Sequence, residues 1–167
     1  MSSLKKLFRD LAVAAALLAA AAATRAQLAV GDAFPPLVPA QLEGAPPDLA
    51  GRVAVVDLWA SWCAPCKAAF PALGQLQRDF AAQDVVVLGV SVDERAKDYA
   101  AFLKKLAPPF ATVRDRDHAL VAALKPAAMP TTFVLGRDGR VRAILTGYHG
   151  KETERALRAA VAAALAH

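Results

Sequence analysis

The 167-residue chain contains only two cysteines and no long stretch without charge. Two thiols are too few for a disulfide-stapled scaffold or for a four-cysteine zinc site. The longest uncharged run, Leu11–Thr24, is shorter than the roughly 20 residues that a membrane-spanning helix needs, which excludes a polytopic membrane protein. Charged residues make up 21% of the chain and apolar residues 56%, so intrinsic disorder is excluded as well.

The first residues of the chain are basic, and a short apolar segment follows them. Lys5, Lys6 and Arg9 precede Leu11–Ala23, and small residues suited to a signal peptidase come next. This order is typical of a secretory signal peptide, which we predict over residues 1–26. An uncleaved N-terminal anchor is the alternative. Both interpretations place the folded domain, residues 27–167, outside the cytoplasm, and we expect a periplasmic protein.

The remaining residues carry 16 basic and 14 acidic side chains, which gives them a net charge of +2. They contain no cluster of Lys and Arg with interleaved aromatic residues, so no nucleic-acid partner is expected. His118, His149 and His167 are scattered along the sequence and offer no paired metal ligands. We therefore expect no bound metal.

Hydrophobic patterns predict strands that alternate with helices. The Pro-rich segment Val30–Pro47 is predicted to be extended, with at most short edge strands. The alternation implies a parallel core sheet with helices on both faces and an antiparallel hairpin at one edge, so the fold class is α/β. The predicted strands are Val53–Trp59, Val85–Val92, Phe110–Val113, Thr131–Leu135 and Arg140–Leu145. The predicted helices follow Cys66, span Tyr99–Leu106, bury Leu120 and Leu124 behind an Asp117 cap, and close the chain over Lys151–Ala166.

Cys63 and Cys66 lie three residues apart, where a predicted strand gives way to a helix. The free N–H groups and the positive dipole end of a helix N-terminus favour a thiolate, which is the nucleophile in disulfide exchange. We therefore assign Cys63, at the helix tip, as the attacking sulfur and Cys66, one turn further in, as the resolving sulfur. Pro65 pre-sets the backbone of the first turn, Lys67 adds positive charge, and Trp62 shields the pair.

A CxxC spacing by itself permits three other interpretations. A structural disulfide is one, although so small a ring constrains the chain little. A zinc half-site is another, but it needs two more ligands. Copper binding is the third, because Cu(I) accepts few thiolate ligands.

Several motifs together resemble the thioredoxin superfamily. Asp57–Lys67 (DLWASWCAPCK) resembles its active-site stretch, and Met129–Phe133 (MPTTF) resembles the segment that carries its cis-proline. Pro71 and Gly147 match a helix-kinking proline and a glycine before the last helix. The Pro-rich lead-in and the helix over residues 99–106 resemble the exported TlpA/ResA-like branch. The resemblance covers roughly residues 30–166. It implies a thioredoxin-like fold, a central mixed sheet flanked by helices, with an extra N-terminal extended segment and a central helix insert.

The resemblance also implies roles for residues around the cysteines. Pro130 would be cis, and the backbone of Met129 would pair with a bound peptide in strand fashion, next to the disulfide. Asp57 lies in mid-strand, where burial should raise its pKa, and it matches the acid behind the second cysteine of thioredoxins. Glu94 matches an acidic residue that TlpA/ResA-like proteins carry near the site. Asp57 is favoured over Glu94 as the group that handles the proton of Cys66, and Glu94 is the alternative.

The expected function is that of an exported thiol–disulfide oxidoreductase that reduces cysteine pairs in substrate proteins. The resemblance implies apocytochrome c or the copper-site subunits of oxidases as substrates, and a membrane electron donor for re-reduction. No cofactor is expected beyond the redox-active disulfide Cys63–Cys66. A copper-transfer protein that uses the same thiolates, and a periplasmic thiol oxidant or isomerase, are the alternatives. Peroxidase activity is disfavoured because Ala60 stands where a peroxiredoxin would carry Thr or Ser.

Overall fold

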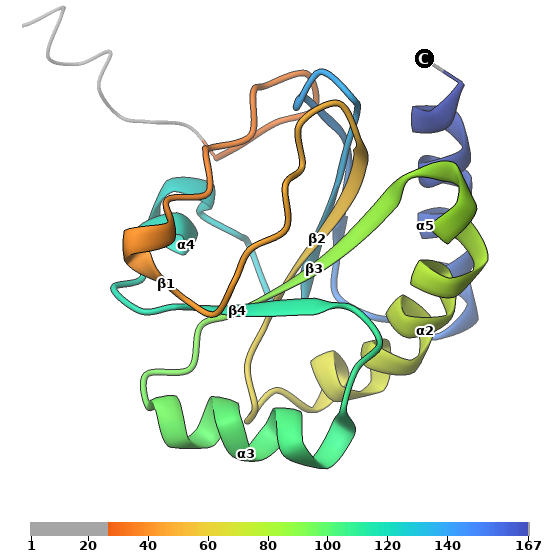
Figure 1. Cartoon of the computed structure of the whole chain (residues 1–167). Helices are drawn as coiled ribbons and strands as arrows, with labels where there is room; N and C mark the ends of the chain where they lie inside the picture. The colour runs from red at the N-terminus through yellow and green to blue at the C-terminus, as the bar shows by residue number, and fades with distance from the viewer. Residues whose placement is uncertain (1–26, 167) are drawn as a thin grey trace, which may run out of the picture.

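The computed structural model describes residues 27–166 (Figure 1). The predicted signal peptide or anchor, residues 1–26, lies outside this range, as does His167. Among the residues described, no helix is both long enough and apolar enough to cross a membrane.

Six strands form one mixed sheet, in the order β1-β4-β3-β2-β5-β6. β3 pairs in parallel with both β2 and β4, whereas β1 with β4, β2 with β5, and β5 with β6 are antiparallel pairs. The predicted mixed sheet with its antiparallel hairpin is therefore confirmed. The short strand β1 is the edge strand that the Pro-rich segment contributes. The strands are β1 (Leu42–Glu43), β2 (Val53–Trp59), β3 (Val85–Ser91), β4 (Ala111–Asp115), β5 (Thr131–Leu135) and β6 (Val141–Thr146).

Helices connect the strands in the predicted order, with one difference at the start of α4. Asp117 does not cap this helix. His118 precedes it in a left-handed conformation with φ of 55° and no capping side-chain bond. Because the chain turns sharply there, Asp115 at the end of β4 accepts a hydrogen bond from the Val121 N–H instead, at 2.8 Å. The helices are α2 (Ala64–Phe80), α3 (Ala96–Leu106), α4 (Ala119–Leu124) and α5 (Lys151–Leu165), with short 3-10 turns η1 (Pro39–Gln41) and η2 (Ala81–Gln83).

The two faces of the sheet are covered differently (Figure 1). On one face, side chains of α2, α3 and α5 pack against Val53, Val55 and Trp59 of β2. On the other face, α4 packs beside the N-terminal segment, where the ring of Phe34 meets Phe133 edge-on at 5.7 Å. The expectation of helices on both faces is thus confirmed, and the extended N-terminal segment covers the second face beside α4.

The strand β2 leads directly into the segment that carries the first cysteine. All seven of its residues are buried, which explains their nearly continuous apolar character. Trp59, at its end, packs against Phe70 of α2 with ring centroids 4.9 Å apart and against Phe102 of α3 at 4.5 Å. Aromatic pairs of this kind contribute about 0.5–1.5 kcal/mol each beyond their buried area. This cluster fixes the start of α2 relative to the end of β2, and the connection between them, residues 60–63, carries the first cysteine.

Candidate active site

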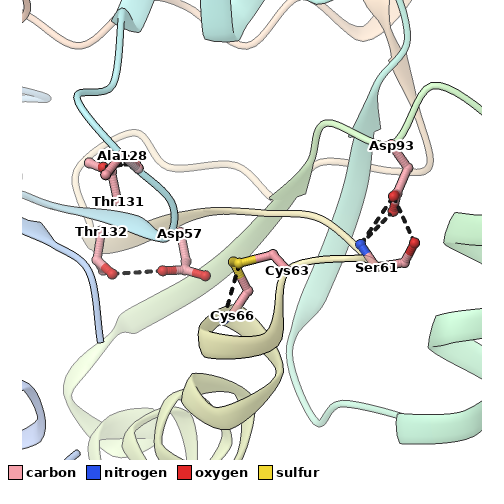
Figure 2. Close-up of a disulfide and its surroundings, with 8 residues drawn as sticks. All are labelled: Asp57, Ser61, Cys63, Cys66, Asp93, Ala128, Thr131 and Thr132. Carbon is pink, nitrogen blue, oxygen red and sulfur yellow. Dashed lines mark hydrogen bonds between the residues drawn. A yellow bond between two sulfur atoms is a disulfide. The ribbon is translucent and has the colours of Figure 1, made fainter. Parts of the chain in front are cut away.

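Cys63 and Cys66 form a disulfide at the N-terminus of α2 (Figure 2). Their Cα atoms lie 5.3 Å apart. Cys63 is the N-cap residue, and its Sγ accepts a hydrogen bond from the Cys66 N–H at 3.2 Å. Cys66 is fully buried, whereas 5% of the surface of Cys63 remains exposed. The residue predicted to attack is therefore the outer one of the pair, and the residue predicted to resolve is the inner one.

The helix tip around Cys63 suits a negative charge. The first turn of α2 contains no acidic residue, and Pro65 lies within it, where its missing N–H leaves no bond unmade. Lys67 is exposed one residue beyond Cys66. A thiolate at Cys63 would therefore meet the Cys66 N–H and the positive end of the helix dipole.

Asp57 is buried in the middle of β2, on the face that α2 covers. Its neighbours along that face, Val55 and Trp59, belong to the core cluster that contains both cysteines, and in Figure 2 its side chain points toward the disulfide. The Thr132 hydroxyl donates a hydrogen bond to Oδ1 at 2.6 Å, and Oδ2 has no partner among the described residues. Burial raises the pKa of Asp57 from 3.8 to about 7, although the bond from Thr132 lowers it somewhat. This carboxyl group can therefore gain or lose a proton near neutral pH.

The loop before β5 brings Met129 and Pro130 to the site. The Met129–Pro130 peptide bond is cis. Met129 is partly buried against the core cluster that holds the two cysteines. Two hydrogen bonds tie the loop down: the Thr131 hydroxyl donates to the Ala128 carbonyl at 2.7 Å, and the Gly147 N–H donates to the Pro130 carbonyl at 2.8 Å. The structure thus places Met129, from this predicted substrate-binding segment, against the same core cluster as the disulfide.

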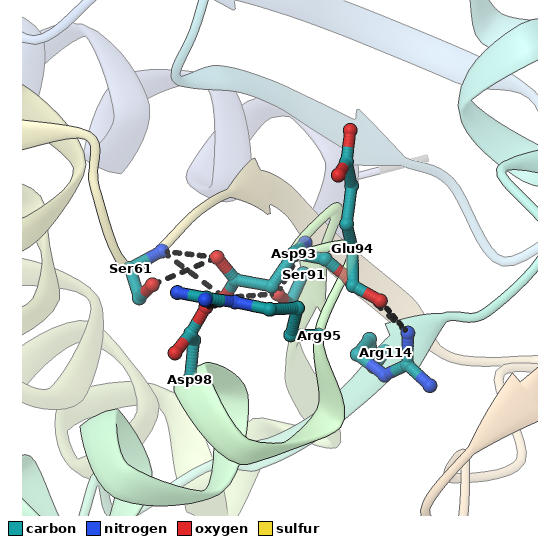
Figure 3. A network of polar contacts seen from close by, with 7 residues as sticks. All are labelled: Ser61, Ser91, Asp93, Glu94, Arg95, Asp98 and Arg114. Carbon is teal, nitrogen blue, oxygen red and sulfur yellow. Dashed lines mark hydrogen bonds and ion pairs between the residues drawn. The ribbon is translucent and has the colours of Figure 1, made fainter.

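Trp62 and Glu94 lie on the outer side of the site. Both line an open groove of about 540 Å³ beside the active-site connection. The indole of Trp62 faces the solvent, since 68% of its surface is exposed. Glu94 is exposed as well, and Figure 3 shows its side chain turned away from Ser61. The two predicted proton handlers are therefore separated: Asp57 lies beneath the disulfide, and Glu94 lies at the surface.

Asp93 is a residue of this site that the sequence reasoning missed. It is 1% exposed and directly precedes Glu94. Its carboxylate accepts hydrogen bonds from the Ser61 N–H at 3.0 and 3.1 Å, from the Ser61 hydroxyl at 2.8 Å and from the Ser91 hydroxyl at 2.8 Å. The signal that was available is its position just after β3, because the carboxyl ends of parallel strands meet at one edge of a sheet.

Comparison with known proteins decides the family. Residues 38–144 match the model of the AhpC/TSA family. The chain belongs to this family. Thiol-disulfide oxidoreductase ResA of Geobacillus thermodenitrificans (strain NG80-2) is 31% identical over 128 residues, which cover 75% of this chain and 74% of that protein. ResA of Bacillus subtilis (strain 168) is 32% identical over 100 residues, 60% of this chain and 56% of that protein.

Comparison with solved structures shows which fold the chain has. A crystal structure described as thiol:disulfide interchange protein DsbE from Chlorobium tepidum superposes with a TM-score of 0.77 at 30% identity, and covers 83% of this chain and 99% of its own. The thioredoxin domain of a Bacteroides vulgatus thiol-disulfide oxidoreductase has a TM-score of 0.66 at 18% identity, and covers 81% of this chain and 99% of its own. The chain therefore has the thioredoxin fold, as its motifs predicted.

Proposed function

We propose that this protein is a thiol–disulfide oxidoreductase whose redox-active group is the Cys63–Cys66 pair. The observation that carries the proposal is the disulfide at the N-terminus of α2, with Cys63 on the outside and Asp57 buried behind it. Burial also raises the pKa of Asp57 to about 7, and carboxyl groups with strongly raised pKa values cluster at functional sites. The names of the ResA and DsbE relatives support the same activity.

In the reducing direction, the Cys63 thiolate attacks one sulfur of a substrate disulfide. The substrate S–S bond breaks, a bond from Cys63 to the substrate forms, and the first substrate sulfur leaves as a thiolate. Cys66 then gives its proton to the Asp57 carboxylate and attacks the Cys63 Sγ. The second substrate sulfur leaves, and two electrons have passed from the protein dithiol to the substrate. The product is the Cys63–Cys66 disulfide.

Asp57 fits the proton transfer because of where it lies. A base works best when its pKa is close to the working pH, and burial brings that of Asp57 to about 7. Its Oδ2 has no hydrogen-bond partner among residues 27–166 and so is free to accept the proton. We assign this role to Asp57 rather than to Glu94, whose side chain is exposed on the loop after β3.

Met129, Pro130 and Trp62 are the residues that we assign to substrate binding. The loop of Met129 and Pro130 ends at β5 and is held in place by its bonds to Ala128 and Gly147. An extended substrate segment could add to the backbone of Met129 as a strand adds to a sheet edge. The exposed indole of Trp62, next to Cys63 in the sequence, offers an apolar surface.

The TlpA/ResA-like resemblance and the basic and apolar start of the sequence support a proposal for the substrates and the location. We propose an exported, periplasmic protein that reduces cysteine pairs such as those of apocytochrome c or of oxidase copper-site subunits. A reductant in an oxidising compartment has to be recharged, which calls for a membrane electron donor. A reduction potential toward about −270 mV would support this direction, whereas one between about −180 and −120 mV would indicate an oxidant or isomerase.

A single-turnover assay tests the activity. The reduced protein is mixed with one equivalent of a synthetic peptide that contains one disulfide, and the products are followed by mass spectrometry. The wild-type protein should yield reduced peptide. Cys66→Ser should stop at a mixed disulfide on Cys63, and Cys63→Ser should form none. Intact peptide beside a demonstrably free Cys63, together with stoichiometric Cu(I) binding, would instead support the copper-transfer alternative.

A further inference from the structure

The connection between β2 and α2, residues 60–63, is tied to a second buried carboxylate that the exchange reaction does not use. We call these four residues the active-site loop. Within it, the Cys63 N–H donates to the Ala60 carbonyl at 3.1 Å, which closes a tight turn around Ser61. Both polar donors of Ser61, its N–H and its hydroxyl, bond to the Asp93 carboxylate. The position of Cys63 therefore depends on a contact between residues 32 positions apart in the sequence.

Asp93 is itself held from three sides (Figure 3). The Ser91 hydroxyl donates to its carboxylate at 2.8 Å, and its own N–H donates to the Ser91 oxygen at 3.0 Å. Arg114 of β4, only 6% exposed, donates from Nη1 to the carbonyl oxygens of Asp93 and Glu94 at 3.2 and 3.1 Å. The same guanidinium bonds Glu43 of β1 at 2.7 Å.

We propose that Asp93 is a positioning residue that holds Cys63 at the tip of α2 through Ser61. The proposal rests on the proposed exchange activity and adds to it the group that keeps the attacking sulfur in its N-cap place. An unanchored loop would let Cys63 move away from the Cys66 N–H and from the helix dipole. Both stabilise the thiolate.

Removing the charge of Asp93 and removing its hydrogen bonds should change the pKa of Cys63 in opposite directions. A negative charge near a thiolate disfavours it, so removal of the charge alone would lower the pKa of Cys63. Loss of the anchor would raise that pKa toward the ~8.5 of a free cysteine. Apart from Asp93 and the two cysteines, the charged or titratable groups of the first turn of α2, of β2 and of the groove beside Trp62 are Lys67, Asp57, Glu94, Arg95, Asp98 and His118, and all of them remain in the variants of this experiment.

The experiment follows the alkylation of Cys63 in the reduced full-length protein between pH 4 and pH 10. The inflection of the alkylation rate of Cys63 against pH is the quantity compared. Asp93→Ala should move this inflection to higher pH and slow exchange with the model peptide roughly ten-fold at pH 7. Asp93→Asn keeps an oxygen that can accept the Ser61 N–H and should restore most of both properties. Ser61→Ala removes one of the donors and should shift the inflection upward by less.

Asp115→Ala is the matched control. Asp115 is a fully buried aspartate near the same end of the sheet, and its carboxylate is bonded to the Val121 N–H, away from the active-site loop. Asp93→Ala and Asp115→Ala should both lower the melting temperature, but only the former should move the Cys63 inflection.

An unchanged inflection in Asp93→Ala, with stability lost as in Asp115→Ala, would overturn the proposal, and so would a downward shift. If Asp93→Ala does not fold, Ser61→Ala decides, and the absence of any shift there refutes the positioning role. A wild-type protein that fails to reduce the peptide, while the shifts appear as expected, would reject the proposed activity and leave the positioning intact.

Discussion

Two buried aspartates flank the active-site disulfide, and they differ in their partners. Asp57 has a single hydrogen bond, from Thr132, and an oxygen with no partner among the described residues. Asp93 receives the N–H and hydroxyl of Ser61 and the hydroxyl of Ser91. Both side chains are at most 1% exposed, so depth does not distinguish them. Their hydrogen-bond partners distinguish them. A carboxyl group with an oxygen that accepts no hydrogen bond can take up a proton, whereas a carboxylate surrounded by donors is suited to hold a loop.

The largest loss of activity is expected when Cys63 is replaced, because the proposed roles of Asp57 and Asp93 both depend on this cysteine. Cys63→Ser removes the attacking sulfur, so reduction of the model peptide should fall to the rate of the buffer alone. The fold should persist, because serine is close in size to cysteine and the small disulfide ring stabilises the chain little. Turnover assays and circular dichroism measure the two properties. Peptide reduction by this variant at the wild-type rate would make the comparison of the aspartates meaningless for catalysis.

Replacement of the proton acceptor should come next in size. Asp57→Asn should slow the attack of Cys66 on the mixed disulfide by about 100-fold at pH 7, because general base catalysis contributes at least that much. The wild-type rate should rise with pH through about 7, where Asp57 loses its proton, and the variant should lack this rise. Stopped-flow measurements of mixed-disulfide resolution supply both profiles. Asp115→Asn serves as the control, and loss of the inflection in Glu94→Gln instead would assign the proton to Glu94.

The burial of Asp57 also predicts that the free energy of unfolding depends on pH. The pKa of Asp57 is raised in the folded protein, to about 7, so the folded state binds the proton more tightly than the unfolded state does. The contribution of Asp57 to the free energy of unfolding is therefore highest below about pH 4. This contribution is lost as the pH rises through about 7. The loss is on the order of 4 kcal/mol at most.

Urea unfolding of the oxidised protein at pH 5 and pH 9 measures this cost. The wild type should lose stability between the two values, and Asp57→Asn should lose much less. An equal loss in both proteins would show that Asp57 is not the group responsible.

A smaller effect is expected from the hydrogen bond that Thr132 donates to the Asp57 carboxyl group. The bond from Thr132 lowers the pKa of Asp57, so Thr132→Val should raise it and move the inflection of the resolving step above that of the wild type. At pH 7 the step should slow several-fold. Thr131→Val is the control, since the Thr131 hydroxyl bonds to the Ala128 carbonyl. An inflection that shifts equally in both variants would indicate a general effect of the loop.

Local patterns were enough to predict most of the fold. The apolar run Val53–Trp59 and the hairpin strand Thr131–Leu135 have the predicted bounds, because side-chain periodicity and turn residues act over a few neighbours. Contacts between distant segments could not be predicted in this way. β1 pairs Glu43 with Arg114, and the ring of Phe34 packs against Phe133 of β5.

The site shows the same limit. The cysteines and Asp57 could be found because a CxxC at a strand-to-helix junction and an acid inside an apolar run are local features. Asp93 could not be, because an aspartate after a strand is common in loops and its partner Ser61 belongs to another connection. The resemblance to TlpA/ResA-like proteins pointed to Glu94, one residue further, whose side chain lies at the surface.

The most direct test of the central claim is the pH dependence of Cys63 alkylation in the reduced wild-type protein. A thiolate at the tip of α2, bonded to the Cys66 N–H, should give an inflection well below ~8.5, with Cys66 reacting far more slowly. An inflection at the value of a free cysteine, or faster reaction of Cys66 than of Cys63, would contradict the assignment of the attacking sulfur.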